Sequence, residues 1–584
     1  MIKKLMRSIR EYKKDSILTP TFVALEVVME VIIPLLMARL IDYGIEKADL
    51  GYIWGMGAVL VVMAMISLMF GALSGRYAAK ASAGFAKNLR KDMYYRVQNF
   101  SFSNIDKFST ASIVTRLTTD VTNVQNAYQM VIRMAVRSPM MLLFSMIMAF
   151  GINADMALIF LAAVPILGIG LWLIMTKAHP IFEKVFRTYD KLNNVVQENL
   201  HGIRVVKSYV REEHEIEKFG KISGSIYRDF TRAEKLLAFN MPLMQFCVYS
   251  CMLLISWLGA RFIVASGNNP AVGMSTGQLM SLITYAMQIL MSLMMLSMVF
   301  VMITISRASA ERIEELLDEE SDLHNGGNPV MEVPDGSVVF RDVNFSYAKD
   351  KNKLCLRDVN LTIASGETVG IIGGTGAAKT SLVQLIPRLY DVTEGEVLVG
   401  GVDVRRYDVE TLREQVAMVL QKNVLFSGTI KDNLRWGNEQ ATDEEMEHVC
   451  KLARADEFIQ TFPKKYDTYI EQGGTNVSGG QKQRLCIARA LLKKPKILIL
   501  DDSTSAVDTK TDALIRKAFR EEIPDTTKII IAQRISSVQD ADKIIVMDGG
   551  KIQDVGTHEE LLKTSSIYRE VYESQMKGGE EDHE

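Results

Sequence analysis

Two short stretches of the chain carry residues whose types and spacing suit phosphate chemistry. In the first, an apolar run, "TVGII", leads into "GGTGAAKTS", Gly373 to Ser381, and then into the helix-like "LVQLIPRLY". Such a loop surrounds phosphates with backbone N–H groups and a helix N-terminus, while a lysine adds charge and a hydroxyl binds magnesium. Lys379 and Thr380 have the residue types for these last two roles, so we expect ATP and Mg²⁺ here. The expected ATP contacts in this loop are Gly373, Gly374, Thr375, Gly376, Ala377, Ala378, Lys379, Thr380 and Ser381.

One position of this loop departs from the pattern G-x-x-x-x-G-K-[ST]. Ala378 stands where the last glycine is expected. Alanine costs little there if the residue is helical, and more if its methyl group points at the phosphates. We expect ATP binding to survive the alanine, with both geometries open.

The second stretch, "ILILDDSTSAVD", runs from Ile497 to Asp508. Its four apolar residues suit a buried strand, and Asp501 at the strand end is placed to hold Mg²⁺ through water. A second acidic residue, Asp502, follows directly. We therefore expect two carboxylates beside the phosphate loop.

The elements around both stretches have the pattern of an α/β domain. "SVVFRDVNFSY" and "LCLRDVNLTI" alternate like antiparallel strands, whereas "ETVGII" and "KILIL" are short apolar runs suited to buried strands separated by helices. The glycine-containing "HNGGNP" marks a boundary before them. This predicts a linker at 307–336, an α/β nucleotide-binding domain with an antiparallel β lobe at 337–576, and an acidic tail at 577–584.

The residues before 307 are typical of a membrane domain. Six segments reach the roughly 20 apolar residues that a membrane-spanning helix needs, so we expect an all-α transmembrane domain at 1–306. Two long connections and the N-terminal "MIKKLMRSIREYKKD" are basic, which places them on the cytosolic side with the nucleotide-binding domain. The long connections read as helical extensions of the spans. The expected spans are about 17–42, 52–76, 132–152, 154–176, 240–266 and 276–305.

Composition limits the other possibilities. A net charge of -2 over 584 residues gives no reason to expect a nucleic-acid partner. The cysteines form neither a disulfide framework nor a metal-ligand cluster, which suits a reducing, cytosolic setting. Cys247 and Cys251, four residues apart, are expected to be small buried side chains. The five cysteines are Cys247, Cys251, Cys355, Cys450 and Cys486.

Two features of the spans are candidates for the transport path. Glu26 and Glu30 share a helix face in the first span, where ionised groups are expensive in lipid. They are either cation-binding residues or a structural pair bonded to neighbouring helices. A methionine stripe in the sixth span either lines a promiscuous binding surface or packs against other helices. It comprises Met287, Met291, Met294, Met295, Met298 and Met302.

Between the two phosphate-site stretches lies "NVSGGQKQR", Asn476 to Arg484. With it, the second half resembles the nucleotide-binding domain of ATP-binding cassette (ABC) transporters, whose signature is serine-glycine-glycine-glutamine at a helix N-terminus. The six spans, "FSNIDKFSTASIVTRLTTDV" and "ENLHGIRVVKSYVREEHE" resemble the exporter branch with type IV architecture. The resemblance covers nearly the whole chain.

The resemblance implies further roles. Tyr347 would stack on adenine, and Gln421 would lie near Mg²⁺ with Thr380 and Asp501, and touch the coupling helices. Glu471 would report to the membrane half, and "SAVD", Ser505 to Asp508, would cross to an opposing cassette. Two cassettes would meet head to tail, so this chain's signature would contact the ATP of the other. The signature residues are Ser478, Gly479, Gly480 and Gln481.

Two residues depart from the catalytic set of that family. Asp502 stands where the family carries the glutamate that polarises the attacking water, and Gln533 stands where it carries a switch histidine. The aspartate draws the carboxylate back by one C–C bond, about 1.5 Å. An error near 1 Å can cost on the order of 10²-fold, so we expect slow hydrolysis at this site. With Ala378, three changes converge on one phosphate site, whereas the signature is intact.

The economical hypothesis is a heterodimer, resembling the degenerate-site subunit of a bacterial heterodimeric exporter. A second half-transporter would supply glutamate and histidine, and this chain's signature would complete the partner's active site. Together the two would move amphiphilic or hydrophobic compounds, drugs among them, across the cytoplasmic membrane by alternating access. ATP would clamp the cassettes together, and hydrolysis would reset them. A homodimeric exporter of drugs, lipids or peptides, and an ATP-binding sensor without transport, are the alternatives.

Overall fold

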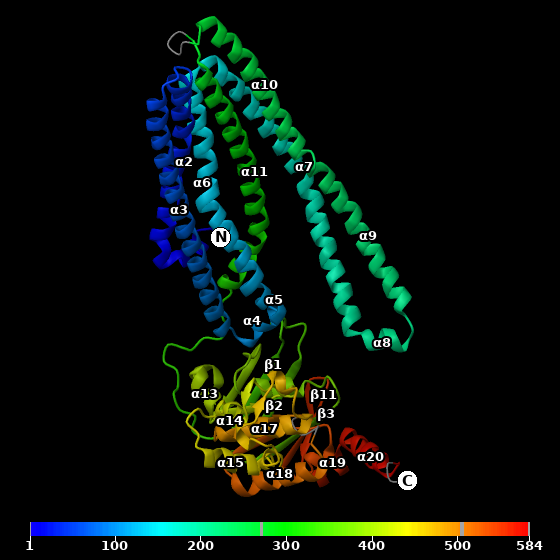
Figure 1. Cartoon of the computed structure of the whole chain (residues 1–584). Helices are drawn as coiled ribbons and strands as arrows, with labels where there is room; N and C mark the ends of the chain where they lie inside the picture. Colours follow the sequence, from blue (N-terminus) through cyan, green and yellow to red (C-terminus); the bar gives the residue numbers. More distant parts are fainter. Residues whose placement is uncertain (1, 269–272, 503–506, 582–584) are drawn as a thin grey trace. The chain divides into compact units, whose positions relative to one another are not determined.

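The computed structural model describes residues 2–268, 273–502 and 507–581. They form two compact units, coloured along the chain in Figure 1. Unit 1 comprises Met1–Gln98 and Thr110–Glu319, and unit 2 comprises Asn99–Ser109 and Glu320–Glu584. The short segment 99–109 therefore belongs to the second unit, although the sequence around it belongs to the first.

The regular elements among the described residues of unit 1 are all helices. Six helical stretches in it are long and apolar enough to cross a membrane, as the sequence predicted. Two of the helices have 49 and 48 residues, far more than the roughly 20 that a bilayer needs, so the predicted helical extensions are present. The principal helices are α2 (Lys13–Arg39), α3 (Leu50–Gln98), α6 (Val121–Ile152), α7 (Ala154–His201), α8 (Ile203–Ser208), α9 (Glu212–Leu237), α10 (Asn240–Ser266) and α11 (Thr276–Asp318).

The described helices of unit 1 pack around apolar cores, two of which share α6 and α11. Val23 and Val27 of α2 pack with Met141 of α6 and Tyr285 of α11. A second apolar core joins α6, α7, α10 and α11, and it buries Cys247 and Cys251. From this core α7 and the α9–α10 pair diverge from α11 toward α8, forming an arm (Figure 1).

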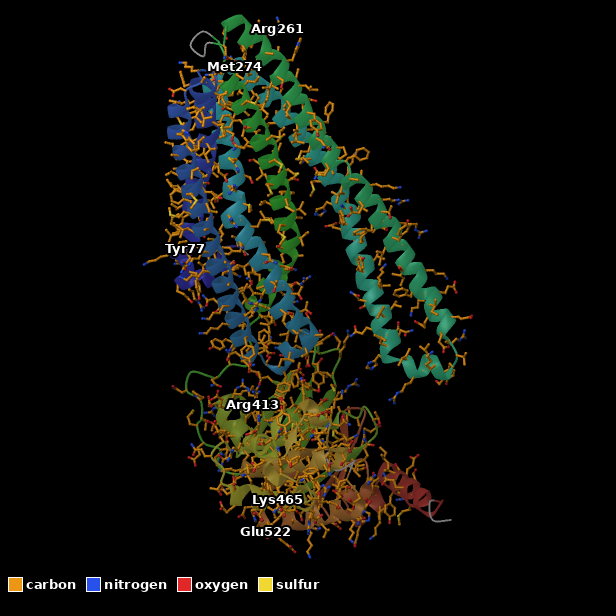
Figure 2. The ribbon with its side chains drawn as sticks, in the orientation of Figure 1. Tyr77, Arg261, Met274, Arg413, Lys465 and Glu522 are labelled. Carbon is orange, nitrogen blue, oxygen red and sulfur yellow. The ribbon has the colours of Figure 1, made fainter. Side chains whose placement is uncertain are left out.

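Tight turns connect neighbouring helices of this unit. Asn153 separates α6 from α7, and its side-chain oxygen accepts a hydrogen bond from the Met156 N–H, which caps the new helix. Ser275 caps α11 in the same way, with a capping box to Gln278. Arg261 of α10 and Met274, just before α11, lie at the same end of the unit (Figure 2).

Unit 2 contains the two predicted sheets. The predicted antiparallel pair is present as β1 (Val338–Phe345) and β2 (Leu356–Ile363). The two apolar runs are the parallel strands β3 (Thr368–Gly373) and β9 (Ile497–Asp501), and both lie beside β10 (Thr527–Ile531) in the six-stranded sheet. In the four-stranded sheet the order is β2 (Leu356–Ile363), β1 (Val338–Phe345), β4 (Glu394–Val399) and β5 (Val402–Asp403). In the six-stranded sheet it is β12 (Lys551–Gly556), β11 (Lys543–Asp548), β3 (Thr368–Gly373), β10 (Thr527–Ile531), β9 (Ile497–Asp501) and β6 (Val416–Val419).

Strand β9 explains why the apolar runs do not alternate. Leu498 and Leu500 belong to the apolar core on one face of the sheet, and Ile497 and Ile499 belong to the core on the other. Both faces are therefore covered, as a parallel sheet requires. The covering helices include α12 (Lys379–Gln384), α17 (Gly479–Leu492), α18 (Thr509–Glu522), α19 (His558–Thr564) and α20 (Ser566–Glu581).

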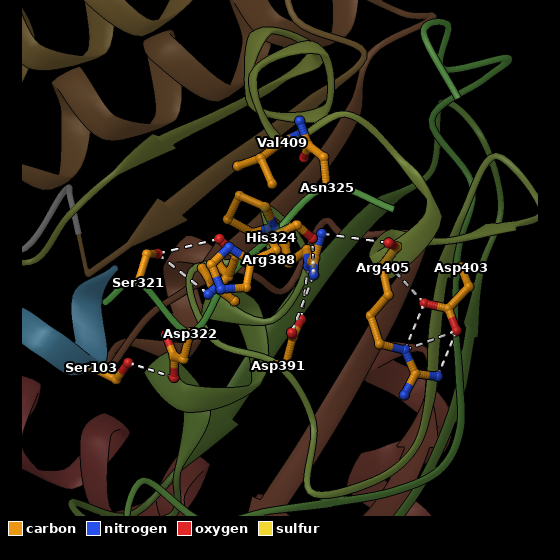
Figure 3. A network of polar contacts seen from close by, with 12 residues as sticks. Ser103, Ser321, Asp322, His324, Asn325, Arg388, Asp391, Asp403, Arg405 and Val409 are labelled. Carbon is orange, nitrogen blue, oxygen red and sulfur yellow. Dashed lines mark hydrogen bonds and ion pairs between the residues drawn. The ribbon is translucent and has the colours of Figure 1, made fainter. Parts of the chain in front are cut away.

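The segment 99–109 packs onto the rest of unit 2 through helix α4 (Phe102–Lys107). The Ser103 hydroxyl donates to Asp322 at 2.8 Å, and the Tyr390 hydroxyl donates to Asp106 at 2.7 Å. Figure 3 shows that Asp322 belongs to a polar network that also contains Arg388, whose guanidinium donates to the His324 carbonyl. The connection after α11 is thus fixed to unit 2 by hydrogen bonds.

Candidate functional site: a phosphate loop beside two carboxylates

The phosphate loop leaves β3 and enters α12. The Lys379 ammonium lies across the loop, donating to the Gly373 and Gly374 carbonyls at 2.8 and 2.9 Å. Burial lowers the pKa of Lys379, and the nearby charges of Asp501 and Asp502 raise it. The net direction of the Lys379 pKa is downward, and the two carboxylates oppose the effect of burial beside backbone groups that suit phosphate.

The structure resolves the question about Ala378. This residue precedes α12 with a left-handed backbone, φ 66°, so it is not helical. Its side chain packs against the apolar core below the loop. The alanine therefore carries a backbone cost, on the order of 1 kcal/mol, rather than a methyl group held against phosphate.

Asp501 lies at the carboxyl end of β9, next to the phosphate loop. The Thr380 hydroxyl donates to its Oδ1 at 3.1 Å. Asp501 is 2% exposed, and this burial raises the pKa of its carboxyl; the Thr380 hydrogen bond opposes the shift, and the Asp502 charge adds to it. The carboxylate oxygen of Asp501 and the hydroxyl oxygen of Thr380 are ligands of the kind that Mg²⁺ prefers.

The residues predicted to hold Mg²⁺ fit that ion. Thr380 and Asp501 already share a hydrogen bond, and Gln421 reaches the adjacent carboxylate, with its Nε2 3.5 Å from Asp502 Oδ2. Their oxygens are hard ligands, and a divalent cation would offset the charges of Asp501 and Asp502. Bound there, Mg²⁺ would neutralise charge on the phosphates of ATP.

Asp502 and Gln533, the two departures from the family pattern, contact each other. Gln533 Nε2 donates to Asp502 Oδ2 at 2.8 Å. Since Gln421 approaches the same oxygen, two amide groups from different loops converge on one carboxylate oxygen. Asp502 itself has a left-handed backbone, φ 49°, and its N–H donates to the Ile531 carbonyl at 2.9 Å. Aspartate tolerates this backbone region better than most residues do.

Tyr347, predicted to stack on adenine, is 46% exposed. Its hydroxyl lies 2.9 Å from the Ser381 hydroxyl and 3.1 Å from Gln384 Oε1, so it is joined to the phosphate loop and α12. Burial raises the pKa of Tyr347. Its ring meets the Tyr390 ring edge-on, with centroids 5.0 Å apart.

The signature lies at the N-terminus of α17. Ser478 accepts from the Gln481 N–H, and Gln481 Oε1 accepts from the Ser478 N–H, which closes a capping box. Ser478 and Gly479 are exposed, and Gly480 and Gln481 are half-buried, so the helix N-terminus is open to solvent. This arrangement suits an anion supplied from outside the chain.

The structure describes Glu471 and part of the segment "SAVD", the other positions to which the resemblance gave a role. Glu471 accepts from the Thr475 hydroxyl at 2.9 Å, and Asp508 caps α18. Ser505 and Ala506 of "SAVD" lie outside the described residues.

The sequence reasoning missed two neighbours of the site, Gln575 and Tyr390. Gln575 Nε2 donates to the Gln533 carbonyl at 2.7 Å, and Tyr390 joins Tyr347 to α4. Neither residue belongs to a nucleotide motif, and no sequence signal identified them.

In unit 1, Glu26 and Glu30 are paired with Arg137 of α6. The Arg137 guanidinium donates to Glu26 Oε1 at 2.5 Å and to both Glu30 oxygens at 2.8 Å. Of the two possibilities raised by the sequence, this geometry matches the structural pair. In the methionine stripe, Met287, Met291, Met295 and Met298 are exposed on the single chain, and Met294 and Met302 are half-buried.

Comparison with known proteins agrees with this architecture. Residues 17–294 match the model of the ABC transporter transmembrane region, and residues 356–505 match the ABC transporter model. A Bacillus subtilis protein, the ABC transporter ATP-binding protein YfiB, is 37% identical over 551 residues, which are 94% of each chain. The chain belongs to the ABC transporters. As an ABC half-transporter, it combines one membrane region with one ATP-binding domain in a multi-pass membrane protein.

This ABC transporter is also similar to a lipid flippase in sequence and to a solved exporter in structure. The ATP-dependent lipid A-core flippase of Desulfotalea psychrophila is 32% identical over 494 residues, 84% of each chain. A solved bacterial Atm1-family ABC exporter with ATP bound has a TM-score of 0.82 over 96% of this chain and 99% of that chain, at 23% identity. The latter shows a shared exporter fold.

Proposed function

We propose that this chain is one subunit of an ATP-driven exporter of lipid-like or amphiphilic compounds, with slow hydrolysis at its own phosphate site. The carrying observation is the contact between Asp502 and Gln533. The Asp502 carboxylate must break its hydrogen bond to the Gln533 amide before it can orient a water molecule. Its side chain is also one carbon shorter than that of the glutamate found in the family, so it reaches less far toward that water. The amide of Gln533 donates a hydrogen bond but does not become a cation, as a histidine can.

The chain's own residues would still bind ATP at this site. Tyr347 offers a ring face, the loop offers N–H groups, and Lys379 offers a cation. Mg²⁺ would be held by Thr380, Gln421 and Asp501. Binding and hydrolysis are thus separated: apart from Ala378, the binding residues keep the family pattern, whereas both residues that would orient water are altered.

A second subunit is supported by exposed apolar surface on each unit. At the tip of the arm, Val205, Tyr209 and Val210 are 60 to 80% exposed. On unit 2, stacked Phe426 and Trp436 border a groove of about 370 Å³. Exposed apolar patches of this kind mark protein interfaces. With the open N-terminus of α17, they support a two-chain assembly.

A lipid-like substrate is supported by a cavity in unit 1. It has a volume of about 530 Å³ and lies between α7 and α11. Trp172, Met175, Leu296 and Phe300 line it with apolar surface, and His179 supplies a polar group. Such a lining suits an amphiphile, and the relative from Desulfotalea psychrophila is a lipid A-core flippase.

The test is transport and ATP turnover in proteoliposomes. The purified chain is compared alone and with a half-transporter that carries glutamate and histidine at the two altered positions. We expect slow turnover alone, and fast turnover with ATP-dependent movement of a fluorescent phospholipid when the two are combined. Lys379→Ala, which removes the loop cation, is the control for binding at this chain's site.

Two outcomes would redirect the proposal. Fast turnover by the chain alone, abolished by Asp502→Asn, would establish the homodimer in which aspartate suffices. Turnover without movement of any lipid or amphiphile would favour the ATP-binding sensor. For the expected orientation, the N-terminus and ATP-binding domain on the cytosolic side of the cytoplasmic membrane, protease protection in right-side-out vesicles is the direct measurement.

A further inference from the structure

The segment that carries Gln533 is held by side chains from three separate places. The Gln533 side chain bonds to Asp502, as described above. Ser537, two residues beyond Ile535, donates to Asp512 Oδ2 of α18 at 3.0 Å. The third contact comes from Gln575 in the C-terminal helix α20. This last contact is made to the backbone of residue 533 itself.

Gln575 uses both ends of its amide on the backbone of this segment. Its Nε2 donates to the Gln533 carbonyl at 2.7 Å, and its Oε1 accepts from the Ile535 N–H at 2.9 Å. The two contacts flank Arg534, so one planar group fixes the backbone on both sides of a single residue. Because the backbone of residue 533 is fixed, the direction in which the Gln533 side chain leaves it is fixed too.

Helix α20 is anchored independently of Gln575. Tyr568 is fully buried, and its hydroxyl lies 2.7 Å from His558 Nδ1 of α19. Val571 and Tyr572 pack against the apolar core that also contains Ile535. Gln575 therefore projects from a rigid support, and loss of its amide would leave the helix in place.

We propose that Gln575 is a positioning residue for ATP turnover, through which the C-terminal helix sets the place of Gln533 against Asp502. This rests on the proposed function, because it concerns the same phosphate site. Gln575 touches neither the loop nor Tyr347, so it acts on the chemical step and not on ATP affinity. Movements of α20, by contact with another protein or with a second copy of the helix, would then alter turnover.

The test uses the purified full chain, with its partner subunit where one co-purifies. The readout is the part of single-turnover ATP hydrolysis that Asp502→Asn removes. Gln575→Ala is expected to accelerate this part about threefold to tenfold, the effect of one net hydrogen bond, because a less firmly placed Gln533 releases Asp502 to orient water. ATP affinity is expected to change less than twofold. Ser574→Ala, the neighbouring change on the same helix, is expected to leave it unchanged.

Two further measurements separate positioning from a structural effect. If Gln575 acts through Gln533, Gln575→Ala has no added effect in a Gln533→Ala background. Amide hydrogen exchange in residues 533–537 is expected to rise in Gln575→Ala while the melting temperature stays within about 2 °C of the parent. An equal acceleration in both backgrounds, a slowing of hydrolysis, or unchanged exchange overturns the proposal.

The proposed function has a separate point of failure. It fails if Asp502→Glu does not accelerate hydrolysis at this site. The coupling of Gln575 to Gln533 is measured as the ratio of hydrolysis rates with and without Gln575→Ala, taken once in the parent and once in the Gln533→Ala background. This comparison can be made whether hydrolysis at the site is slow or fast.

Discussion

Gln533 Nε2 lies 2.8 Å from Asp502 Oδ2, so the side chains at the two altered catalytic positions are hydrogen-bonded to each other. The two substitutions therefore form one local arrangement rather than two separate losses. A glutamate at 502 with a histidine at 533 would place a longer carboxylate beside a titratable ring. Asp502 and Gln533 should therefore be substituted together as well as singly.

Asp502→Glu is expected to accelerate hydrolysis at this site by about 10-fold to 100-fold, because the carboxylate regains one C–C bond of reach. Combined with Gln533→His, the gain should exceed that of either single change, since the two side chains are in contact. Single-turnover hydrolysis on the full chain measures both. Asp502→Asn is the matched loss variant, and turnover unaffected by all three changes would contradict a chemical role for this pair.

Ala378→Gly is expected to change the free energy of unfolding by less than about 1 kcal/mol and the Kd for ATP by less than twofold. Relief of the left-handed backbone favours the glycine, while loss of the packed methyl group opposes it. Ala378→Val, which places a β-branched residue at positive φ, should destabilise by about 2 kcal/mol or more. Thermal denaturation with and without ATP checks both variants. A tenfold gain in ATP affinity for the glycine variant would show that the methyl group faces the phosphates after all.

Arg137→Gln is expected to destabilise unit 1 by about 3 kcal/mol or more, because it leaves Glu26 and Glu30 without their cation. Glu26 is 7% exposed, so water does little to compensate. Glu30→Gln should destabilise unit 1 far less, because Glu26 and Arg137 still form an ion pair. Melting curves in detergent compare these with Arg261→Gln, a change at an exposed arginine on α10. Similar losses for Arg137→Gln and Arg261→Gln would mean that the pair is not structural.

The sequence predicted the large-scale architecture because each element carried its own local signal. The apolar length of the six spans, the alternation in β1 and β2, and the glycine-rich loop before Lys379 needed no knowledge of distant contacts. These predictions rest on spacing within a few residues.

The features that the sequence did not reveal depend on distant pairing. Glu26 meets Arg137 across 111 residues, and Gln575 meets Gln533 across 42. A single sequence does not indicate which distant residues will be in contact. The left-handed backbone of Ala378 was equally hidden, because the residue type there argues against it.

Asp501→Asn is expected to raise the melting temperature at pH 7.5 while abolishing Mg²⁺-dependent hydrolysis. Burial raises the pKa of Asp501, so the folded chain favours its protonated form more than the unfolded chain does. The ionised carboxylate therefore destabilises the fold as the pH rises above the carboxyl's ordinary range, and the amide removes that cost. The advantage of the variant should shrink as the pH is lowered through the raised pKa toward the ordinary value of an aspartate, about 3.9. Melting curves across this pH range, with Asp508→Asn at an exposed helix cap as the control, measure it. A difference that grows on acidification would contradict the assignment.

Tyr390→Phe is expected to weaken the link between ATP binding and transport while leaving ATP affinity within about threefold. The Tyr390 hydroxyl donates to Asp106 of α4, and its ring meets Tyr347 edge-on. Burial raises the pKa of Tyr390, so the hydroxyl remains a donor throughout the physiological range. The phenylalanine keeps the ring contact with Tyr347 and removes only the bond to α4, whose loss costs about 1 kcal/mol or more because Asp106 is charged. The ratio of lipid molecules moved to ATP hydrolysed in proteoliposomes is therefore the quantity that should fall. Asp106→Asn should reproduce the fall, since it weakens the same bond from the other side, and a normal ratio in both variants would exclude this contact from the transport cycle.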